Sequence, residues 1–142
     1  MLDGVARRLI GPSLDGAGAR IAAAGVSADQ VTWVGFLLGA LAAAAIVGEG
    51  YLIGLLLILL SRLCDGLDGA VARYTQKTDR GGFLDIVLDF AFYGMIPLAF
   101  VLAEPERNAV AGAVLIASFY LNGASFLAYA IMAERRALAG EA

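Results

Sequence analysis

The sequence predicts an all-α, polytopic bundle of transmembrane helices, and its composition gives the first reason. Of the 142 residues, 61% are hydrophobic and 16% are charged, whereas soluble domains carry about 25% charged residues. The second reason is that the apolar residues form four long stretches, each comparable with the roughly 20 residues that a helix needs to cross a bilayer. They are residues 31–47, 51–74, 82–103 and 109–133. We therefore expect four membrane helices in one domain, residues 1–142.

Residues 1–10 differ from these stretches because charged and apolar residues are interspersed in them. Plotted at about 100° per residue, the apolar side chains share one face and the charged ones point elsewhere, as in a helix that lies in the membrane interface. The apolar face consists of Leu2, Val5, Ala6, Leu9 and Ile10, and the charges are Asp3, Arg7 and Arg8. We expect an interfacial amphipathic helix here. We expect no cleavable signal peptide, since that would need a continuous apolar stretch.

The basic residues lie mostly on one side of the four stretches. They precede the first stretch (Arg7, Arg8, Arg20), surround the connection between the second and third (Arg73, Lys77, Arg80) and follow the fourth (Arg135, Arg136). Lys and Arg are enriched in cytoplasmic loops of membrane proteins. The pattern therefore predicts an integral protein of the bacterial inner membrane, with both termini and residues 73–81 in the cytoplasm.

The sequence also excludes several kinds of chemistry. It has no histidine, which excludes nucleophilic triads that depend on one. Cys64 is the only cysteine, so the chain can form neither an intrachain disulfide nor a cysteine cluster for zinc or iron–sulfur. No tract of basic residues indicates a nucleic-acid partner. Chemistry based on carboxylates and metal ions remains open.

Four aspartates lie at the predicted cytoplasmic ends of the second and third stretches. Asp65 and Asp68 are spaced i,i+3, and Asp85 and Asp89 are spaced i,i+4, so each pair shares one helix face. The two helices are joined by the short polar run 75–81, which predicts antiparallel neighbours whose acidic ends meet.

Such a cluster needs a counter-charge, because an ionised aspartate at the centre of a membrane helix costs about 2.5 to 3.5 kcal/mol. Ion pairs with Arg62 and Arg73 could neutralise two of the four carboxylates. Two divalent cations, Mg²⁺ or Mn²⁺, could instead bind the four and form a two-metal site for phosphoryl transfer. A purely structural cluster and an ion-translocating cluster are the alternatives.

Taken together, these residues resemble the signature of the CDP-alcohol phosphatidyltransferase family, whose class-I members are integral membrane enzymes. The matching positions are Asp65, Asp68, Gly69, Ala72, Arg73, Gly81, Asp85 and Asp89. The resemblance implies that the four aspartates hold two divalent metals and that Gly69, Ala72, Arg73 and Gly81 line the CDP site. It implies that Asp89 is the general base for transfer of a phosphatidyl group from CDP-diacylglycerol to a small alcohol, with release of CMP.

The sequence departs from the family pattern in two places. Before Thr32 it has Ala28-Asp29 where family members usually have Pro-Asn. The family commonly has six membrane helices, whereas we expect four here, without the last two. A homodimer or another membrane protein could complete the wall of the site. The alternatives are an inactive or assembly-dependent membrane subunit and a divalent-metal transporter.

Three basic residues near the acids have more than one interpretation. Arg62, Lys77 and Arg80 are candidates for contacts with the acceptor or a phosphate. Arg62 could equally form an ion pair with an aspartate. Lys77 and Arg80 could simply be the cations expected in a cytoplasmic loop.

Overall fold

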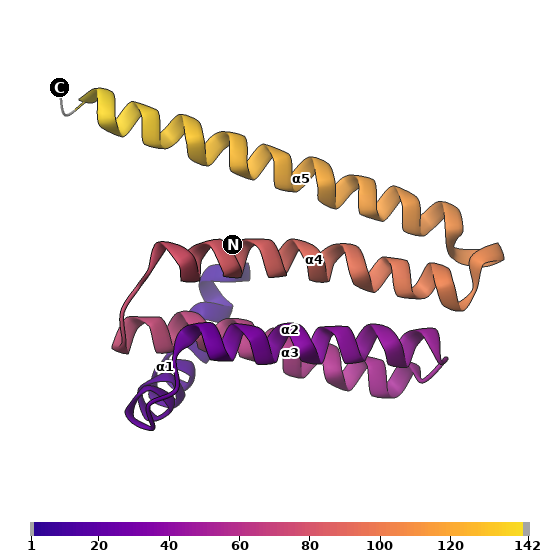
Figure 1. Cartoon of the computed structure of the whole chain (residues 1–142), viewed down its shortest axis with the longest axis horizontal. Helices are drawn as coiled ribbons and strands as arrows, with labels where there is room; N and C mark the ends of the chain where they lie inside the picture. The colour runs from indigo at the N-terminus through magenta and orange to yellow at the C-terminus, as the bar shows by residue number, and fades with distance from the viewer. Residues whose placement is uncertain (1, 141–142) are drawn as a thin grey trace.

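The structure is a computed structural model that describes the backbone of residues 2–140 and the side chains of residues 11–137. The described chain is all-helical, as predicted (Figure 1). Its five helices are α1 (Leu2–Ala23), α2 (Ala28–Val47), α3 (Tyr51–Tyr74), α4 (Asp79–Ala103) and α5 (Pro105–Gly140). The helices extend beyond several of the apolar stretches because polar residues start them.

Two helix starts show how polar residues define the ends. At α2, the Ser27 hydroxyl accepts a hydrogen bond from the backbone N–H of Gln30, and the Gln30 side chain accepts one from the N–H of Ser27. This reciprocal capping box satisfies two backbone donors that the helix itself cannot. At α4, the Thr78 hydroxyl accepts from the N–H of Gly81 at 3.0 Å, so this helix begins before the apolar residues do.

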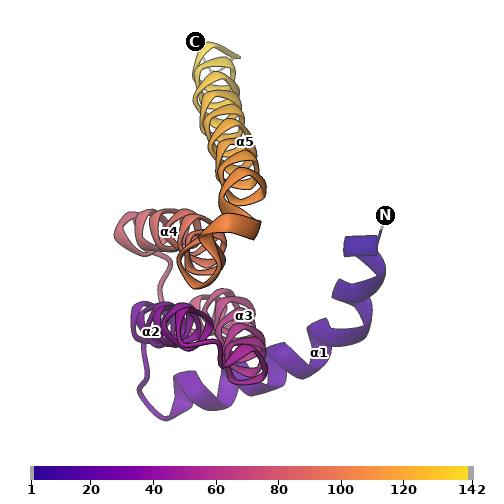
Figure 2. The same cartoon turned by 90° about the vertical axis from the view of Figure 1, so that its right-hand side faces the viewer.

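Helices α2, α3 and α4 run side by side and alternate in direction (Figures 1 and 2). Two small residues of α2, Gly35 and Gly39, allow a close approach of the neighbouring helices. A Cβ atom added at Gly39 would lie 2.7 Å from the Phe92 ring of α4, and one at Gly35 would lie 3.0 Å from Cβ of Cys64 in α3. A side chain at Gly39 would displace the Phe92 ring, and one at Gly35 would crowd Cys64.

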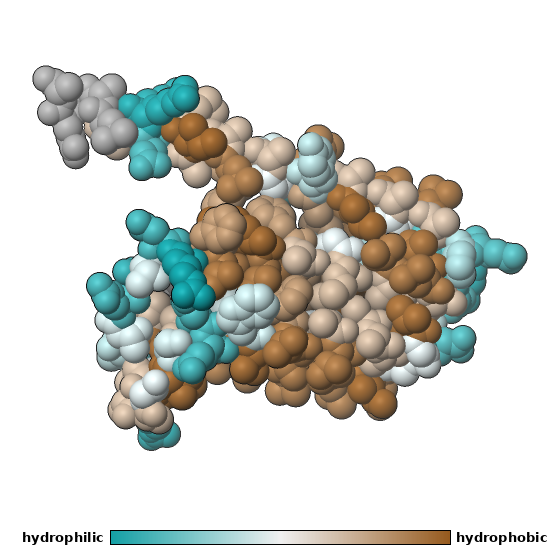
Figure 3. Space-filling view, viewed as in Figure 1, coloured by the Kyte–Doolittle hydropathy of each residue, from teal (hydrophilic) through white to brown (hydrophobic). Residues whose placement is uncertain are grey.

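Within the part of the chain that the structure describes, three helices are long and apolar enough to cross a membrane: α2, α4 and the Pro105–Ala137 part of α5. Figure 3 shows hydrophobic side chains covering the middle of the bundle and hydrophilic ones gathered toward its ends. The protein is therefore an integral membrane protein. Helix α3 carries more charge, including Arg62, Asp65 and Asp68. It connects the end of α2 to the start of α4, and these two helices run in the same direction. A fourth crossing by α3 stays a prediction.

Helix α1 lies crosswise to the other helices, at the end where α3 connects to α4 (Figures 1 and 2). It packs closely on α3, because a Cβ at Gly18 would lie 2.7 Å from the Cβ of Ala70. This is the orientation expected of a helix on the membrane surface. The apolar face predicted for residues 2–10 involves side chains outside the described residues.

Candidate functional site

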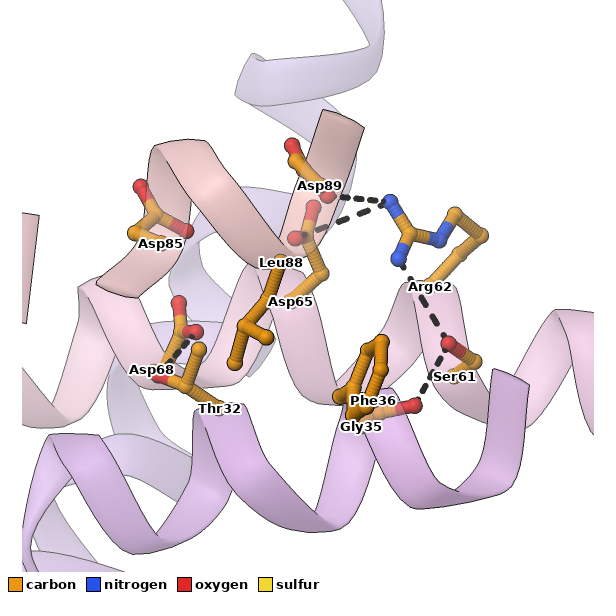
Figure 4. Close-up of a pocket in the computed structure, with 10 residues that line it drawn as sticks. All are labelled: Thr32, Gly35, Phe36, Ser61, Arg62, Asp65, Asp68, Asp85, Leu88 and Asp89. Atoms are coloured by element: carbon orange, nitrogen blue, oxygen red, sulfur yellow. Dashed lines mark hydrogen bonds and ion pairs between the residues drawn. The ribbon is translucent and has the colours of Figure 1, made fainter. Parts of the chain in front are cut away.

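Three of the four aspartates form one carboxylate cluster between α3 and α4. Asp65, Asp68 and Asp85 each place a carboxylate oxygen within 4.8 Å of the other two. Asp68 is buried at 5% exposure, Asp65 is half-buried, and Asp85 is exposed. Figure 4 shows them turned toward a shared space between the two helices. The i,i+3 spacing in α3 and the antiparallel arrangement of α4 produce this convergence.

Asp89 lies one helical turn beyond Asp85 and is engaged with Arg62. An Nη atom of Arg62 donates to Oδ1 of Asp89 at 2.7 Å and lies 3.6 Å from Oδ1 of Asp65. The guanidinium also sits over the Phe92 ring, 3.9 Å from its centroid. The pairing of Arg62 with an aspartate, one of the two interpretations of this arginine, is therefore the arrangement in the structure.

Helix α2 supports the cluster from a third side. The Thr32 hydroxyl lies 2.7 Å from Oδ2 of Asp68, to which it donates, and 3.0 Å from the carbonyl of Ala28. One turn further along, the buried Ser61 of α3 donates to the carbonyl of Gly35 in α2 at 2.7 Å. Sequence reasoning missed the link between Thr32 and Asp68. The two residues are 36 positions apart, and no local spacing reports such a contact.

A groove of about 370 Å³ adjoins the cluster at the α3–α4 connection. All four residues expected to line a CDP site are in its wall: Gly69, Ala72, Arg73 and Gly81. Asp68 and Asp85 line the groove as well, so it opens directly onto the carboxylates. Apart from its chain neighbours and the adjacent helix backbone, no described residue has a heavy atom within 4 Å of the position that a Cβ of Gly69 would take. A ligand can therefore approach this part of α3 closely.

The remaining basic residues are placed differently from one another. Lys77 lines the groove. Arg80 is 78% exposed, with its Nε 3.8 Å from Oδ2 of Asp29. Arg73 forms an ion pair with Asp15 of α1. The hypothesis that Arg73 neutralises one of the four aspartates is therefore wrong for this structure. Arg73 sits in the last turn of α3, where α1 crosses, and Asp15 is within its reach.

Comparison with known proteins identifies the family. The profile of the CDP-alcohol phosphatidyltransferase family matches residues 26–139. The chain belongs to this family. The match includes α2 to α4 and nearly all of α5, hence every residue of the carboxylate cluster and of the groove.

Three relatives of this CDP-alcohol phosphatidyltransferase family member illustrate how similar its sequence is to those of known proteins. The inner membrane protein YnjF of Escherichia coli is 51% identical over 111 residues, which cover 78% of this chain and 54% of YnjF. The archaetidylinositol phosphate synthase of Pyrococcus horikoshii is 30% identical over 110 residues, 77% of this chain and 58% of that protein. The phosphatidylcholine synthase of Pseudomonas aeruginosa is 34% identical over 100 residues, 63% and 42% of the two chains.

The chain thus spans about half the length of the curated relatives it matches. No solved structure matches it.

The donor set of the cluster fits the divalent metals that the family uses. Each of Asp65, Asp68 and Asp85 offers carboxylate oxygen, the ligand that Mg²⁺ and Mn²⁺ prefer. Like-charged carboxylates this close repel one another unless a cation lies between them. Arg62 supplies a positive charge on the Asp65–Asp89 side. No basic side chain among the described residues is paired with Asp68 or Asp85.

Proposed function

We propose that this protein is a phospholipid-biosynthetic transferase that moves a phosphatidyl group from CDP-diacylglycerol to a small alcohol and releases CMP. The observation that carries the proposal is that Asp68 and Asp85 belong both to the carboxylate cluster and to the wall of the groove. A nucleotide in the groove would hold its pyrophosphate against the carboxylates. Two relatives are named as synthases of lipids with an alcohol headgroup, which favours the same reaction class.

The cofactors in this proposal are two divalent ions, Mg²⁺ or Mn²⁺, held by Asp65, Asp68, Asp85 and Asp89. When bound, they would neutralise the pyrophosphate and stabilise the negative charge that develops on departing CMP. Thr32 contributes by holding Oδ2 of Asp68 through its hydrogen bond. The carboxylate oxygens are thereby oriented before a ligand arrives.

The CDP moiety is proposed to lie along Gly69, Ala72, Arg73 and Gly81. The missing side chain of Gly69 leaves space for close approach of the ligand. Gly81 lies in the first turn of α4, where the helix dipole favours an anion. Arg73 adds a positive charge in the groove wall.

Asp89 is proposed as the general base. Its carboxylate takes the proton from the acceptor hydroxyl, and the hydroxyl oxygen attacks the β-phosphorus, which carries the diacylglycerol. The bond from this phosphorus to the bridging oxygen breaks, and CMP leaves with that oxygen. The product is a phosphodiester. The position of Asp89 supports this role, because Asp89 lines the same small cavity as Asp65, Asp68 and Asp85 (Figure 4).

Lys77 and Arg80 are proposed contacts for a phosphate on the acceptor or on a lipid headgroup. Lys77 lies in the groove wall, and the exposed Arg80 is in the first turn of α4 beside it. Basic residues at this membrane surface attract anionic groups. We also propose that the N-terminus and the site face the cytoplasm across a bacterial inner membrane, the location printed in the name of the E. coli relative.

We also propose that the protein forms a homodimer. A charged groove between membrane helices must be walled off from lipid, and the second chain would supply part of that wall. Light scattering of the detergent-purified protein measures this state directly. A particle containing a single chain, after correction for bound detergent, would contradict the dimer without affecting the reaction.

The reaction is tested by incubating purified protein with radiolabelled CDP-diacylglycerol, Mg²⁺ or Mn²⁺ and a panel of alcohols. We expect metal-dependent CMP release with at least one acceptor and its loss in Asp89→Asn. A folded protein that releases no CMP with any acceptor would overturn the enzyme proposal. Proteoliposomes that then accumulate Mn²⁺ would indicate a transporter, and absence of both activities would indicate a silent subunit.

A further inference from the structure

Arg62 occupies the centre of the polar contacts between α3 and α4. Its guanidinium reaches Asp89 at 2.7 Å and Asp65 at 3.6 Å, two acids that come from different helices. A positive charge between two like charges offsets their repulsion. The guanidinium donates its hydrogen bond to Oδ1 of Asp89, and the other oxygen of that carboxylate points away from Arg62 (Figure 4).

The guanidinium is itself held from two sides. The Phe92 ring lies 3.9 Å below it, a cation–π distance. Its second Nη is 3.5 Å from Oγ of Ser61, which is fully buried and bonded to the carbonyl of Gly35. These contacts connect α2, α3 and α4 through one arginine. Asp89 is thus oriented by a side chain that the packed helices keep in place.

Stability alone does not explain an arginine at this position. Its Nε is buried and has no hydrogen-bond partner among the described residues. A buried donor left without a partner destabilises a fold, and well-packed apolar residues often replace buried ion pairs without loss of stability. An unsatisfied group of this kind calls for another explanation, such as a role at a functional site.

We propose that Arg62 is a positioning residue for Asp89. It holds Oδ1 of the general base, so that the second oxygen is presented to the acceptor hydroxyl. The inference rests on the proposed phosphatidyl transfer. It assigns Arg62 a role different from a contact with the acceptor or a phosphate.

The test measures kcat and KM for CMP release by the full chain and by Arg62→Met, Arg62→Lys and Phe92→Leu. Misplacement of the base lowers kcat, so we expect a loss of about 10- to 100-fold in Arg62→Met. KM for CDP-diacylglycerol and for the acceptor should stay within about threefold, because a positioning role gives Arg62 no contact with either substrate. Arg62→Lys should recover part of kcat. Phe92→Leu, which leaves every charge in place, should lower kcat by about two- to fivefold.

Mn²⁺ binding without substrate provides a readout independent of turnover. Removing a cation beside the carboxylates should leave Mn²⁺ binding to Arg62→Met as tight as in the parent or tighter. Arg107→Met is the matched control, because Arg107 also pairs with an acid, Glu104 at 3.1 Å, but at the other end of the bundle. It should leave kcat and Mn²⁺ binding unchanged.

An inactive parent would overturn the proposed function and this inference together. With an active parent, the inference alone fails if Arg62→Met keeps the parental kcat, if its main effect is a raised KM, or if it loses Mn²⁺ binding. Should Arg62→Met fail to fold, a parental kcat in Phe92→Leu would overturn the inference.

Discussion

The hydroxyl of Thr32 donates a 2.7 Å hydrogen bond to Oδ2 of Asp68 and so joins α2 to the carboxylate cluster of α3 and α4. Asp68 is the most buried of the clustered acids, and this is its one hydrogen bond to another side chain among the described residues. A fixed carboxylate binds a cation with less loss of conformational freedom than a rotating one. Groups that orient ligands in this way contribute strongly to metal affinity.

Replacement of Thr32 by valine should therefore weaken divalent-metal binding. Valine has the shape of threonine without the hydroxyl, and we expect Mn²⁺ affinity to fall by about 10-fold. Thr32→Ser should keep most of the affinity. Thr75→Val is the matched control, because the Thr75 hydroxyl donates only to the carbonyl of Val71 in its own helix. Mn²⁺ titration of the purified proteins checks this, and equal affinities in Thr32→Val and the parent would contradict it.

Removal of a carboxylate from the cluster should abolish stabilisation by metal. At a concentration 100 times the dissociation constant, a bound ion stabilises the folded state by about 2.7 kcal/mol. We expect Mg²⁺ or Mn²⁺ to raise the thermal midpoint of the parent but not that of Asp68→Ala. Glu106→Gln, at the far end of the bundle, should respond like the parent. An unchanged metal response in Asp68→Ala would count against the metal site.

The sequence alone predicted most of the architecture because hydrophobic stretches, basic loops and helix spacing are local patterns. The convergence of Asp65 and Asp68 with Asp85 required only the i,i+3 spacing and an antiparallel neighbour. The gathering of Gly69 and Gly81 in one groove has the same origin, since they flank the connection between the two helices.

Contacts between distant segments could not be predicted in the same way. The sequence offered Arg73 two acids in α3, Asp65 and Asp68, and others on the next helix. Its partner is nevertheless Asp15. That choice depends on where α1 crosses α3, and the crossing is set by the contact of Gly18 with Ala70. Likewise, the pairing of Arg62 with Asp89 depends on contacts with another helix, because the Arg62 guanidinium packs on the Phe92 ring of α4.

Close packing around Gly39 should make this position intolerant of side chains. A Cβ here would lie 2.7 Å from Cδ2 and 3.1 Å from Cε2 of Phe92, and 3.3 Å from Oγ of Ser61. Displacement of a buried ring costs about 1 to 3 kcal/mol, so we expect Gly39→Val to lower the free energy of unfolding by that amount. Gly94→Ala is the control, because no described residue beyond the adjacent helix backbone lies within 4 Å of the added Cβ. This variant should be neutral or slightly stabilising. Unfolding in mixed micelles measures both, and equal stabilities of Gly39→Val and the parent would refute the packing argument.

The ion pair between Asp15 and Arg73 should contribute little to stability, because both side chains are about half exposed, 45% and 51%. Exposed pairs typically contribute less than about 1 kcal/mol, so Asp15→Asn should change the free energy of unfolding by no more than this and should leave CMP release intact. Arg73→Met removes the same pair and also a positive charge from the groove wall. It should raise KM for CDP-diacylglycerol with a similarly small change in stability. Measured together, the two variants separate the two roles of Arg73. If Arg73 serves only the ion pair, Asp15→Asn and Arg73→Met should have the same KM. If Arg73 contacts the nucleotide, only Arg73→Met should have a raised KM.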